Sequence, residues 1–207
     1  MLGSLLQAVR QTHPLIHCIT NYVTINDCAN ILLAAGASPI MADAVEEAAA
    51  VTARSQGLTL NLGTLHAERI PAMLASGRQA NASGIPAVLD PVGAGVSAFR
   101  AGAARQLLEA VQFAVIRGNL SEIRALADAG SHARGVDAGD SLTPQTLDAC
   151  LELAGQLARR TGAVVAVTGE TDLVTDGETA YCIHNGHPMM RSVTGTGCQL
   201  SCLTAAF

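Results

Sequence analysis

Residues 86–91, PAVLDP, contain the stretch that decides the fold. Three apolar residues run without interruption up to Asp90, and a proline stands at each end of the stretch. A short apolar run bounded by turn-forming residues is typical of a strand that is buried on both faces of a sheet. The run also places a carboxylate at the point where the strand stops.

Similar apolar runs recur on either side of this one, and helical patterns separate them. Strands are expected over residues 38–42, 58–63, 113–116 and 163–169, and helices over residues 24–35, 67–76, 101–111, 121–129 and 143–160, with a surface loop over residues 129–140. Thr143 is the expected N-cap of the last helix and Pro144 its first residue. Strands that alternate with helices in this way predict an α/β fold, with a largely parallel central sheet and helices on both faces.

The pattern changes after residue 169. Residues 172–175 and 179–184 are two short extended runs, and the turn-forming pair Asp176-Gly177 lies between them. This arrangement predicts a hairpin at the edge of the sheet.

Length and composition narrow the class of protein. The 207 residues suit a single domain that spans residues 1–207, and a 49% hydrophobic content with 14% charged residues excludes intrinsic disorder. A net charge of -5 without a basic cluster argues against a nucleic-acid partner. No apolar window is long enough to cross a membrane and no basic leader opens the chain, so a cytoplasmic protein is expected. Its cysteines lack metal-ligand spacing and are expected to be reduced thiols.

Polar segments follow the predicted strands. They comprise residues 61–63 (NLG), 90–93 (DPVG), 117–119 (RGN), 168–170 (TGE) and 195–197 (GTG). Ligands of parallel sheets bind at the carboxyl ends of the strands, where such loops converge. We therefore expect these five segments to form one site.

The glycine-rich stretch at residues 193–201, VTGTGCQLS, leads from Gly195 and Gly197 into a run that can begin a helix. The free N–H groups and the positive end of the dipole at a helix N-terminus favour a phosphate or a developing negative charge. An ordinary tight connection would have the same pattern, so the surrounding residues must decide.

Four residues could serve phosphoryl transfer, which needs charge neutralisation and a metal for the nucleotide phosphates. Asp90 and Glu122 offer oxygen ligands suited to Mg²⁺, Arg117 adds a fixed cation, and Thr168 a hydroxyl. The alternatives stay open: Glu122 could favour a helix N-terminus, Arg117 could pair with a surface acid, and threonine is common in strands.

A second group lies nearer the N-terminus. Asn21 follows an apolar run, and Met41 follows a proline-containing segment, so the two could line a small apolar pocket with one amide for orientation. A buried methionine is also an ordinary core residue. The chain has neither a phosphate-loop lysine motif nor a nucleophile elbow. A nicotinamide-dependent oxidoreductase is disfavoured because the glycine turn lies so near the C-terminus.

Six ordered motifs give the chain a strong resemblance to the hydroxyethylthiazole kinase family of the ribokinase-like superfamily. They are residues 17–21 (HCITN), 36–41 (GASPIM), 89–93 (LDPVG), 116–122 (IRGNLSE), 167–170 (VTGE) and 195–198 (GTGC). The resemblance implies a ribokinase-like fold and ATP-dependent phosphorylation of 4-methyl-5-(2-hydroxyethyl)thiazole in thiamine biosynthesis and salvage. It also implies Mg²⁺ as a cofactor, and a homotrimer with pockets at the subunit interfaces.

The resemblance also implies a role for each site residue. Met41, Asn21, Gly63 and Gly195 would bind the thiazole alcohol, Arg117 and Thr168 would bind ATP, Asp90 and Glu122 would organise magnesium, and Cys198, Gly195 and Gly197 would form the catalytic turn. Cys198 occupies the place where related sugar kinases carry an aspartate base. A thiol is a poorer base than a carboxylate at neutral pH. We therefore expect Cys198 to lie beside the substrate hydroxyl, with the anion site and the metal supplying most of the catalysis.

Family members continue beyond the point that corresponds to Phe207, so the chain is expected to lack their C-terminal segment. Two alternatives to the thiazole kinase stay open. One is a kinase for another small alcohol, such as a hydroxymethylpyrimidine. The other is a form that binds the ligand without transferring phosphate.

Overall fold

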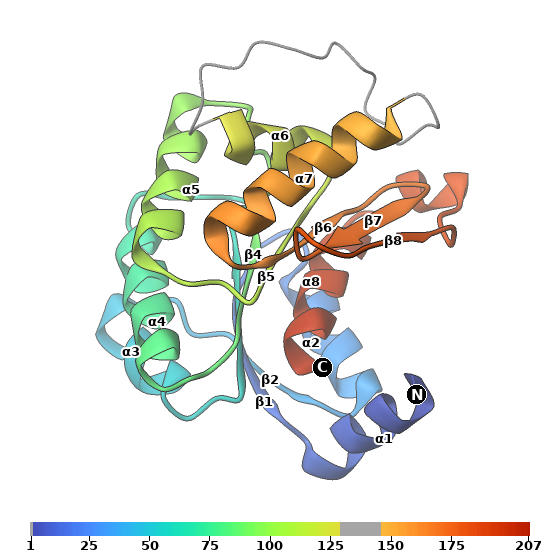
Figure 1. The fold of residues 1–207 in the computed structure, drawn as a ribbon. Coiled ribbons are helices and arrows are strands. Elements are labelled where there is room, and N and C mark those ends of the chain that lie inside the picture. The colour runs from blue at the N-terminus through green and yellow to red at the C-terminus, as the bar shows by residue number, and fades with distance from the viewer. Residues whose placement is uncertain (1, 129–145) are drawn as a thin grey trace.

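The computed structural model describes residues 2–128 and 146–207. Their strands form one eight-stranded sheet in the order β2-β1-β3-β4-β5-β6-β7-β8 (Figure 1). The strands are β1 (Leu15–Ile19), β2 (Ser38–Ile40), β3 (Gly57–Asn61), β4 (Ala87–Asp90), β5 (Val115–Gly118), β6 (Val164–Val167), β7 (Asp172–Thr175) and β8 (Ala180–Ile183). Strands β1 to β6 are parallel, whereas β7 and β8 run antiparallel at one edge. The predicted parallel sheet and edge hairpin are therefore confirmed.

The helices cover the sheet in two layers (Figure 1). They are α1 (Leu2–Thr12), α2 (Ile25–Ala35), α3 (Val45–Thr52), α4 (Arg69–Ala82), α5 (Ala98–Ala110), α6 (Leu120–Asp128), α7 (Leu147–Thr161) and α8 (Thr196–Ala206), with a short 3-10 turn at Pro188–Ser192. Helices α3 to α7 pack on one face over the larger apolar core, and α1, α2 and α8 pack on the other over a smaller one.

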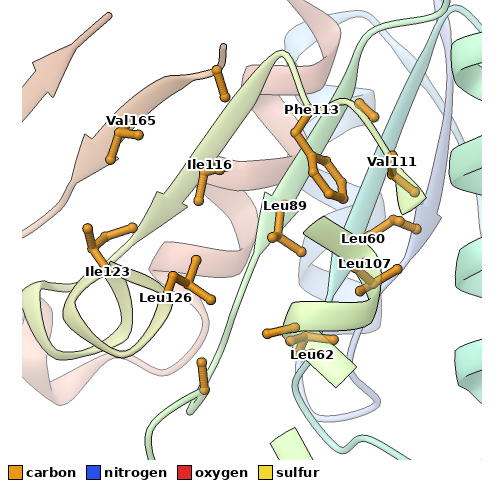
Figure 2. Packing of buried hydrophobic residues seen from close by; sticks show 14 of the residues in the cluster. Leu60, Leu62, Leu89, Leu107, Val111, Phe113, Ile116, Ile123, Leu126 and Val165 are labelled. Atoms are coloured by element: carbon orange, nitrogen blue, oxygen red, sulfur yellow. The ribbon is translucent and has the colours of Figure 1, made fainter. Parts of the chain in front are cut away.

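The larger core explains why the central strands read as continuous apolar runs. Leu60 and Leu89 of neighbouring strands lie near Leu107 of α5, and Ile116 lies near Ile123 of α6 (Figure 2). Every residue of β3 and β4 is buried, including the polar residues Asn61 and Asp90 at their carboxyl ends. These two side chains therefore need polar partners within the protein.

Left-handed glycines end two of the helices. Gly36 has a φ of 102° and its N–H bonds the carbonyls of Leu32 and Leu33, which ends α2 where the sequence predicts. Gly162, with a φ of 73°, ends α7 in the same way. A side chain in this backbone conformation would be strained, so the two glycines fix where each helix stops.

Several predicted boundaries move. The helix expected over residues 67–76 extends over Arg69–Ala82, and the strand expected over residues 113–116 begins two residues later and reaches Gly118. The predicted surface loop at 129–140 and the predicted helix start at Thr143 and Pro144 lie outside the described residues. Helices α1 and α3 and the strand character of β1 are additional findings. In the described part of the chain, every helix is too short or too polar to cross a bilayer.

Candidate active site

The N-terminus of α8 meets the carboxyl ends of five parallel strands. The residues that gather there come from the ends of β1, β3, β4, β5 and β6, and they are Asn21, Asn61, Asp90, Arg117 and Thr168. The predicted convergence of polar loops at one rim is therefore present in the structure.

Gly195 forms the entrance to α8. It has a left-handed φ of 80°, and a Cβ there would overlap the side chain of Thr24. Glycine is required by both the backbone conformation and the close approach of α2. The turn brings the first N–H groups of α8 to the rim, where they have no partner within the helix.

Asn61 is the central hydrogen-bonding residue of the site. Its Nδ2 donates to Asp90 Oδ2 (2.8 Å) and to Cys198 Sγ (3.3 Å), and its Oδ1 accepts from Gly63 N (2.8 Å) and from Asn21 Nδ2 (3.2 Å). Asn21 Nδ2 also donates to Cys198 Sγ at 3.1 Å. The sulfur of Cys198 thus lies between two amide donors from different strand ends.

Asp90 is fully buried and carries the most perturbed carboxylate of the site. Its Oδ2 accepts from Asn61 and from Ser201 Oγ (2.8 Å) and lies 3.7 Å from Arg117 Nη1, whereas its Oδ1 has no hydrogen-bond partner in the described residues. Burial raises the pKa of Asp90 to about 6, although Arg117, Ser201 and Asn61 oppose that shift.

Arg117 links three strand ends. Besides the ion pair with Asp90, its Nη2 donates to the hydroxyl of Thr168 at the end of β6. A Cβ at Gly197 would stand 2.5 Å from Arg117 Nη1, so the guanidinium packs directly on the first turn of α8. The sequence alternative of a surface ion pair for Arg117 is wrong, because its partner is the buried Asp90.

Cys198 is a neutral thiol in this environment. Burial and the nearby carboxylate of Asp90 raise the pKa of the thiol above its ordinary value, and hydrogen bonds to Thr24, Asn61 and Asn21 offset this only in part. The two amide groups donate to the sulfur, so the S–H bonds to neither of them.

Glu122 caps a helix in this structure. Its Oε2 accepts from Asn119 N (2.8 Å) and its Oε1 from Gly93 N (3.0 Å), while Asn119 Oδ1 accepts from Glu122 N (2.9 Å). This is a reciprocal cap at the start of α6, and it also ties the loop after β4 to the end of β5. Each carboxylate oxygen has a second lone pair for a further ligand.

A magnesium ion fits this donor set through water. Asp90 and Glu122 supply carboxylates at neighbouring strand ends, and Asp90 Oδ1 is an acceptor without a partner in the described residues. Mg²⁺ characteristically keeps several waters and uses one or two carboxylates together with substrate phosphates. The described ranges contain no cluster of three or more His, Cys, Asp or Glu side chains that could hold a metal alone.

A cavity of about 800 Å³ opens beside Arg117. Thr168 and the first turn of α8, Thr196 and Gly197, line its inner wall, and residues 185–188 line its outer part. Its walls therefore combine a cation, a hydroxyl and a helix N-terminus, the groups that an anionic ligand needs.

Met41 and Gly63 are not among the residues that line this cavity. A Cβ at Gly63 would come within 2.6 Å of Asn21 Cβ, so this glycine permits the close approach of two strand ends. Met41 follows β2 and packs, half-buried, against the smaller core, as Cys198 also does. Its contact with the smaller core also fits the other sequence interpretation, an ordinary core methionine.

Two residues of the network are missing from the sequence prediction as site residues. Asn61 and Ser201 are both fully buried and both bond to Asp90. The local signal is a polar residue at the end of a buried strand for Asn61, and a hydroxyl at the end of the glycine-rich stretch, one turn after Gly197, for Ser201. Neither signal identifies a partner that lies 29 or 111 residues away.

Comparison with known proteins agrees with this geometry. Residues 6–207 match the hydroxyethylthiazole kinase family. The hydroxyethylthiazole kinase of Clostridium beijerinckii is 50% identical over 206 residues, which cover 100% of this chain and 75% of that protein. That of Methanoculleus marisnigri is 51% identical over 205 residues, covering 99% of this chain and 72% of that protein.

Solved structures show the same fold. The hydroxyethylthiazole kinase protein from Pyrococcus horikoshii superposes with a TM-score of 0.87 at 37% identity, covering 98% of this chain and 74% of that one. A ribokinase-like superfamily protein from Enterococcus faecalis has a TM-score of 0.62 at 11% identity over 93% of this chain and 70% of its own, which shows likeness of fold alone. With its buried Asp90 and its glycine turn at the rim of a ribokinase-like sheet, this chain belongs to the hydroxyethylthiazole kinase family, a family of phosphotransferases.

Proposed function

We propose that this site transfers the terminal phosphoryl group of ATP to the hydroxyl of 4-methyl-5-(2-hydroxyethyl)thiazole at the N-terminus of α8. The observation that carries the proposal is the position of Gly195 and Gly197. One glycine faces Thr24 on the side of Asn21, and the other faces Arg117 on the side of the cavity. The same turn therefore reaches both an acceptor side and a nucleotide side.

The nucleotide side is formed by Arg117, Thr168 and the first turn of α8. The guanidinium and the Thr168 hydroxyl face a cavity whose volume suits a nucleotide. Arg117 neutralises phosphate charge, and the N–H groups at the start of α8 donate hydrogen bonds to the oxygens of the migrating group. Mg²⁺, when bound through Asp90 and Glu122, supplies further charge neutralisation to the phosphates.

The acceptor side is formed by Asn21, Gly63, Met41 and Gly195. Asn21 and Asn61 hold the Cys198 sulfur by two amide donors, so the thiol can orient its proton toward the substrate hydroxyl. Phosphoryl transfer through a loose transition state leaves the attacking hydroxyl protonated until late, so a strong base is not needed to begin the reaction. Cys198 then positions the hydroxyl instead of deprotonating it: as the new P–O bond forms and the bond to ADP breaks, the hydroxyl proton passes to an oxygen of the transferred phosphoryl group.

A coupled assay of ADP release tests the proposal. The rate with ATP and the thiazole alcohol should exceed the rate with ATP alone, and a hydroxymethylpyrimidine should give a lower kcat/KM. Isothermal calorimetry with each ligand separates a weak kinase from a protein that only binds. Binding of the thiazole alcohol without ADP release would overturn phosphoryl transfer, and preference for the pyrimidine would overturn the assigned substrate.

We also propose that the chain works as a homotrimer, as the resemblance implies. Exposed apolar side chains beside the acceptor side support it: Tyr22 and Val23 follow Asn21, and Val45 lies just after Met41. Contiguous exposed apolar residues mark surfaces that bind another chain.

A further inference from the structure

Arg69 is a buried arginine that lies outside the network described above. It begins α4, and its side chain is only 6% exposed. Its Nη2 donates to the carbonyl of Thr20, its Nε lies 3.1 Å from Asp43 Oδ2, and its guanidinium carbon lies 4.7 Å from the centre of the Tyr22 ring. One side chain therefore contacts the loop after β1 and the loop after β2.

These two loops carry Asn21 and Met41, two of the four residues of the proposed acceptor side. Thr20 and Tyr22 flank Asn21, and Asp43 lies two residues after Met41. The Tyr22 hydroxyl donates to Asp43 Oδ2 at 3.0 Å. The carboxylate of Asp43 thus forms an ion pair with the buried Arg69 and accepts a hydrogen bond from Tyr22 of the loop after β1.

A buried histidine strengthens the same connection. His17 of β1 bonds Ala42 O through Nε2 (2.7 Å) and Thr52 Oγ1 through Nδ1 (2.8 Å). Burial lowers the pKa of His17, so the ring is neutral at physiological pH. A carbonyl can only accept, so Nε2 carries the proton of the neutral ring and donates to Ala42 O.

The burial of Arg69 has a cost that its contacts do not fully offset. Its Nη1 is buried without a hydrogen-bond partner in the described residues, and an unsatisfied buried donor is destabilising. Well-packed apolar residues often stabilise a fold better than a buried ion pair does. Stability alone is therefore a poor reason for a guanidinium here, whereas a fixed geometry between two loops is a good one.

We propose that Arg69 is a positioning residue for the alcohol substrate: it fixes the spacing between Asn21 and Met41 without touching substrate or nucleotide. The inference rests on the proposed function of those two residues. The nucleotide side is held separately, by Arg117 with Asp90 and Thr168. Loss of Arg69 should therefore weaken the acceptor side selectively.

Steady-state kinetics of Arg69→Met tests this, because methionine keeps an apolar stem and removes the charged fork. The KM for the thiazole alcohol should rise by about tenfold or more, while the KM for ATP should change by less than about twofold. Arg69→Lys should recover only part of the affinity, since one ammonium cannot reproduce the fork geometry. Arg78→Met is the matched control: Arg78 lies on the same helix and is exposed, and both KM values should stay unchanged.

Calorimetry with the thiazole alcohol in the absence of nucleotide separates the possible failures. If the unaltered protein does not bind the alcohol, the proposed function fails. If it binds and Arg69→Met binds equally well, the positioning role fails. Tyr22→Phe is a second test that stays valid if Arg69→Met misfolds, because it removes only an exposed hydroxyl. It should raise the dissociation constant several-fold, and an unchanged constant would also contradict the role of the Asp43 link.

Discussion

At the scale of single residues, Asn61 lies between two ionisable side chains of the site, the carboxylate of Asp90 and the thiol of Cys198. One amide nitrogen donates to Asp90 and to Cys198, so a carboxylate and a sulfur with raised pKa values share one partner. A short amide can serve both because its two hydrogens point in different directions. Aspartate at position 61 would place a second carboxylate beside Asp90, where like charges repel.

The raised pKa of Asp90 predicts how stability depends on pH. Between about pH 4 and pH 6 the folded protein retains a proton on Asp90 that the unfolded chain releases, so this group destabilises the fold as the pH rises through that window. The free energy of unfolding, relative to Asp90→Asn, should fall by about 3 kcal/mol across it. Urea unfolding of both proteins in EDTA at several pH values measures the difference, and parallel curves would contradict the prediction.

Cys198 offers a test of whether the thiol acts as a base. A neutral thiol that only orients the hydroxyl predicts that Cys198→Ala loses less than about 100-fold in kcat, the lower end of what a general base contributes. Cys198→Asp should be at least as active as the alanine variant, because it restores a carboxylate base. Turnover measured by ADP release decides the matter. If alanine abolished activity and aspartate restored none, the thiol would have a specific role.

At the scale of elements, the first turn of α8 is shaped by what packs against it. Gly195 lies against α2, and Gly197 lies against the guanidinium of Arg117. Gly195 precedes the helix and has a left-handed φ, whereas Gly197 lies in its first turn, and at both positions a Cβ would collide with a neighbouring side chain. The register of the sheet matters equally, because Asn61 lies directly opposite Asp90 in the pairing of β3 with β4.

A methyl group at Gly197 should disturb nucleotide binding. In Gly197→Ala the Cβ displaces the Arg117 guanidinium from Asp90 and Thr168, and we expect the KM for ATP to rise by about tenfold. Gly102→Ala in α5 is the matched control, because nothing lies within 4 Å of its Cβ. It should leave kinetics unchanged and stabilise the protein by about 0.5–1 kcal/mol in thermal unfolding. An unchanged KM for ATP in Gly197→Ala would show that the position of the guanidinium is unimportant.

Local patterns predict most elements but not their neighbours. The apolar runs and turn residues identify β3, β4, β6 and the edge hairpin. A strand that is buried on both faces needs apolar residues at successive positions, and the turns between elements need turn-forming residues. They do not identify β1 as a strand, since His17 interrupts the apolar run. Its polarity is compensated by Thr52 and Ala42, which lie 35 and 25 residues away. The polar partners of Asp90 are equally distant, so no local pattern predicts them.

At the scale of the whole molecule, the two layers of helices cover two separate apolar cores, one on each face of the sheet. The larger core packs α3 to α7 against the sheet. The smaller core packs α1, α2 and α8 against the other face, and α8 begins with the turn that we propose to bind phosphate. The acceptor loops carry exposed apolar residues, among them Tyr22, Val23 and Val45. Its environment therefore depends on whether another chain covers that surface.

Sedimentation equilibrium should give a mass of three times 21.1 kDa for the purified protein. Exposed apolar residues next to the acceptor loops are the physical reason to expect association. Val23→Glu should shift the species toward the monomer, whereas Val96→Glu, at another exposed valine, should not. A monomer for the unaltered protein would contradict the trimer.

The contact between Asn21 and Cys198 joins positions 177 residues apart in the chain. A ribosome that adds roughly 5–20 residues per second synthesises this interval in about 10–35 s. Until residues 196–206 emerge, the nascent chain leaves the apolar surface that α8 covers open to chaperones and to aggregation. Enzymatic turnover during translation should therefore not appear before α8 has docked, which comes well after the central strands have been synthesised.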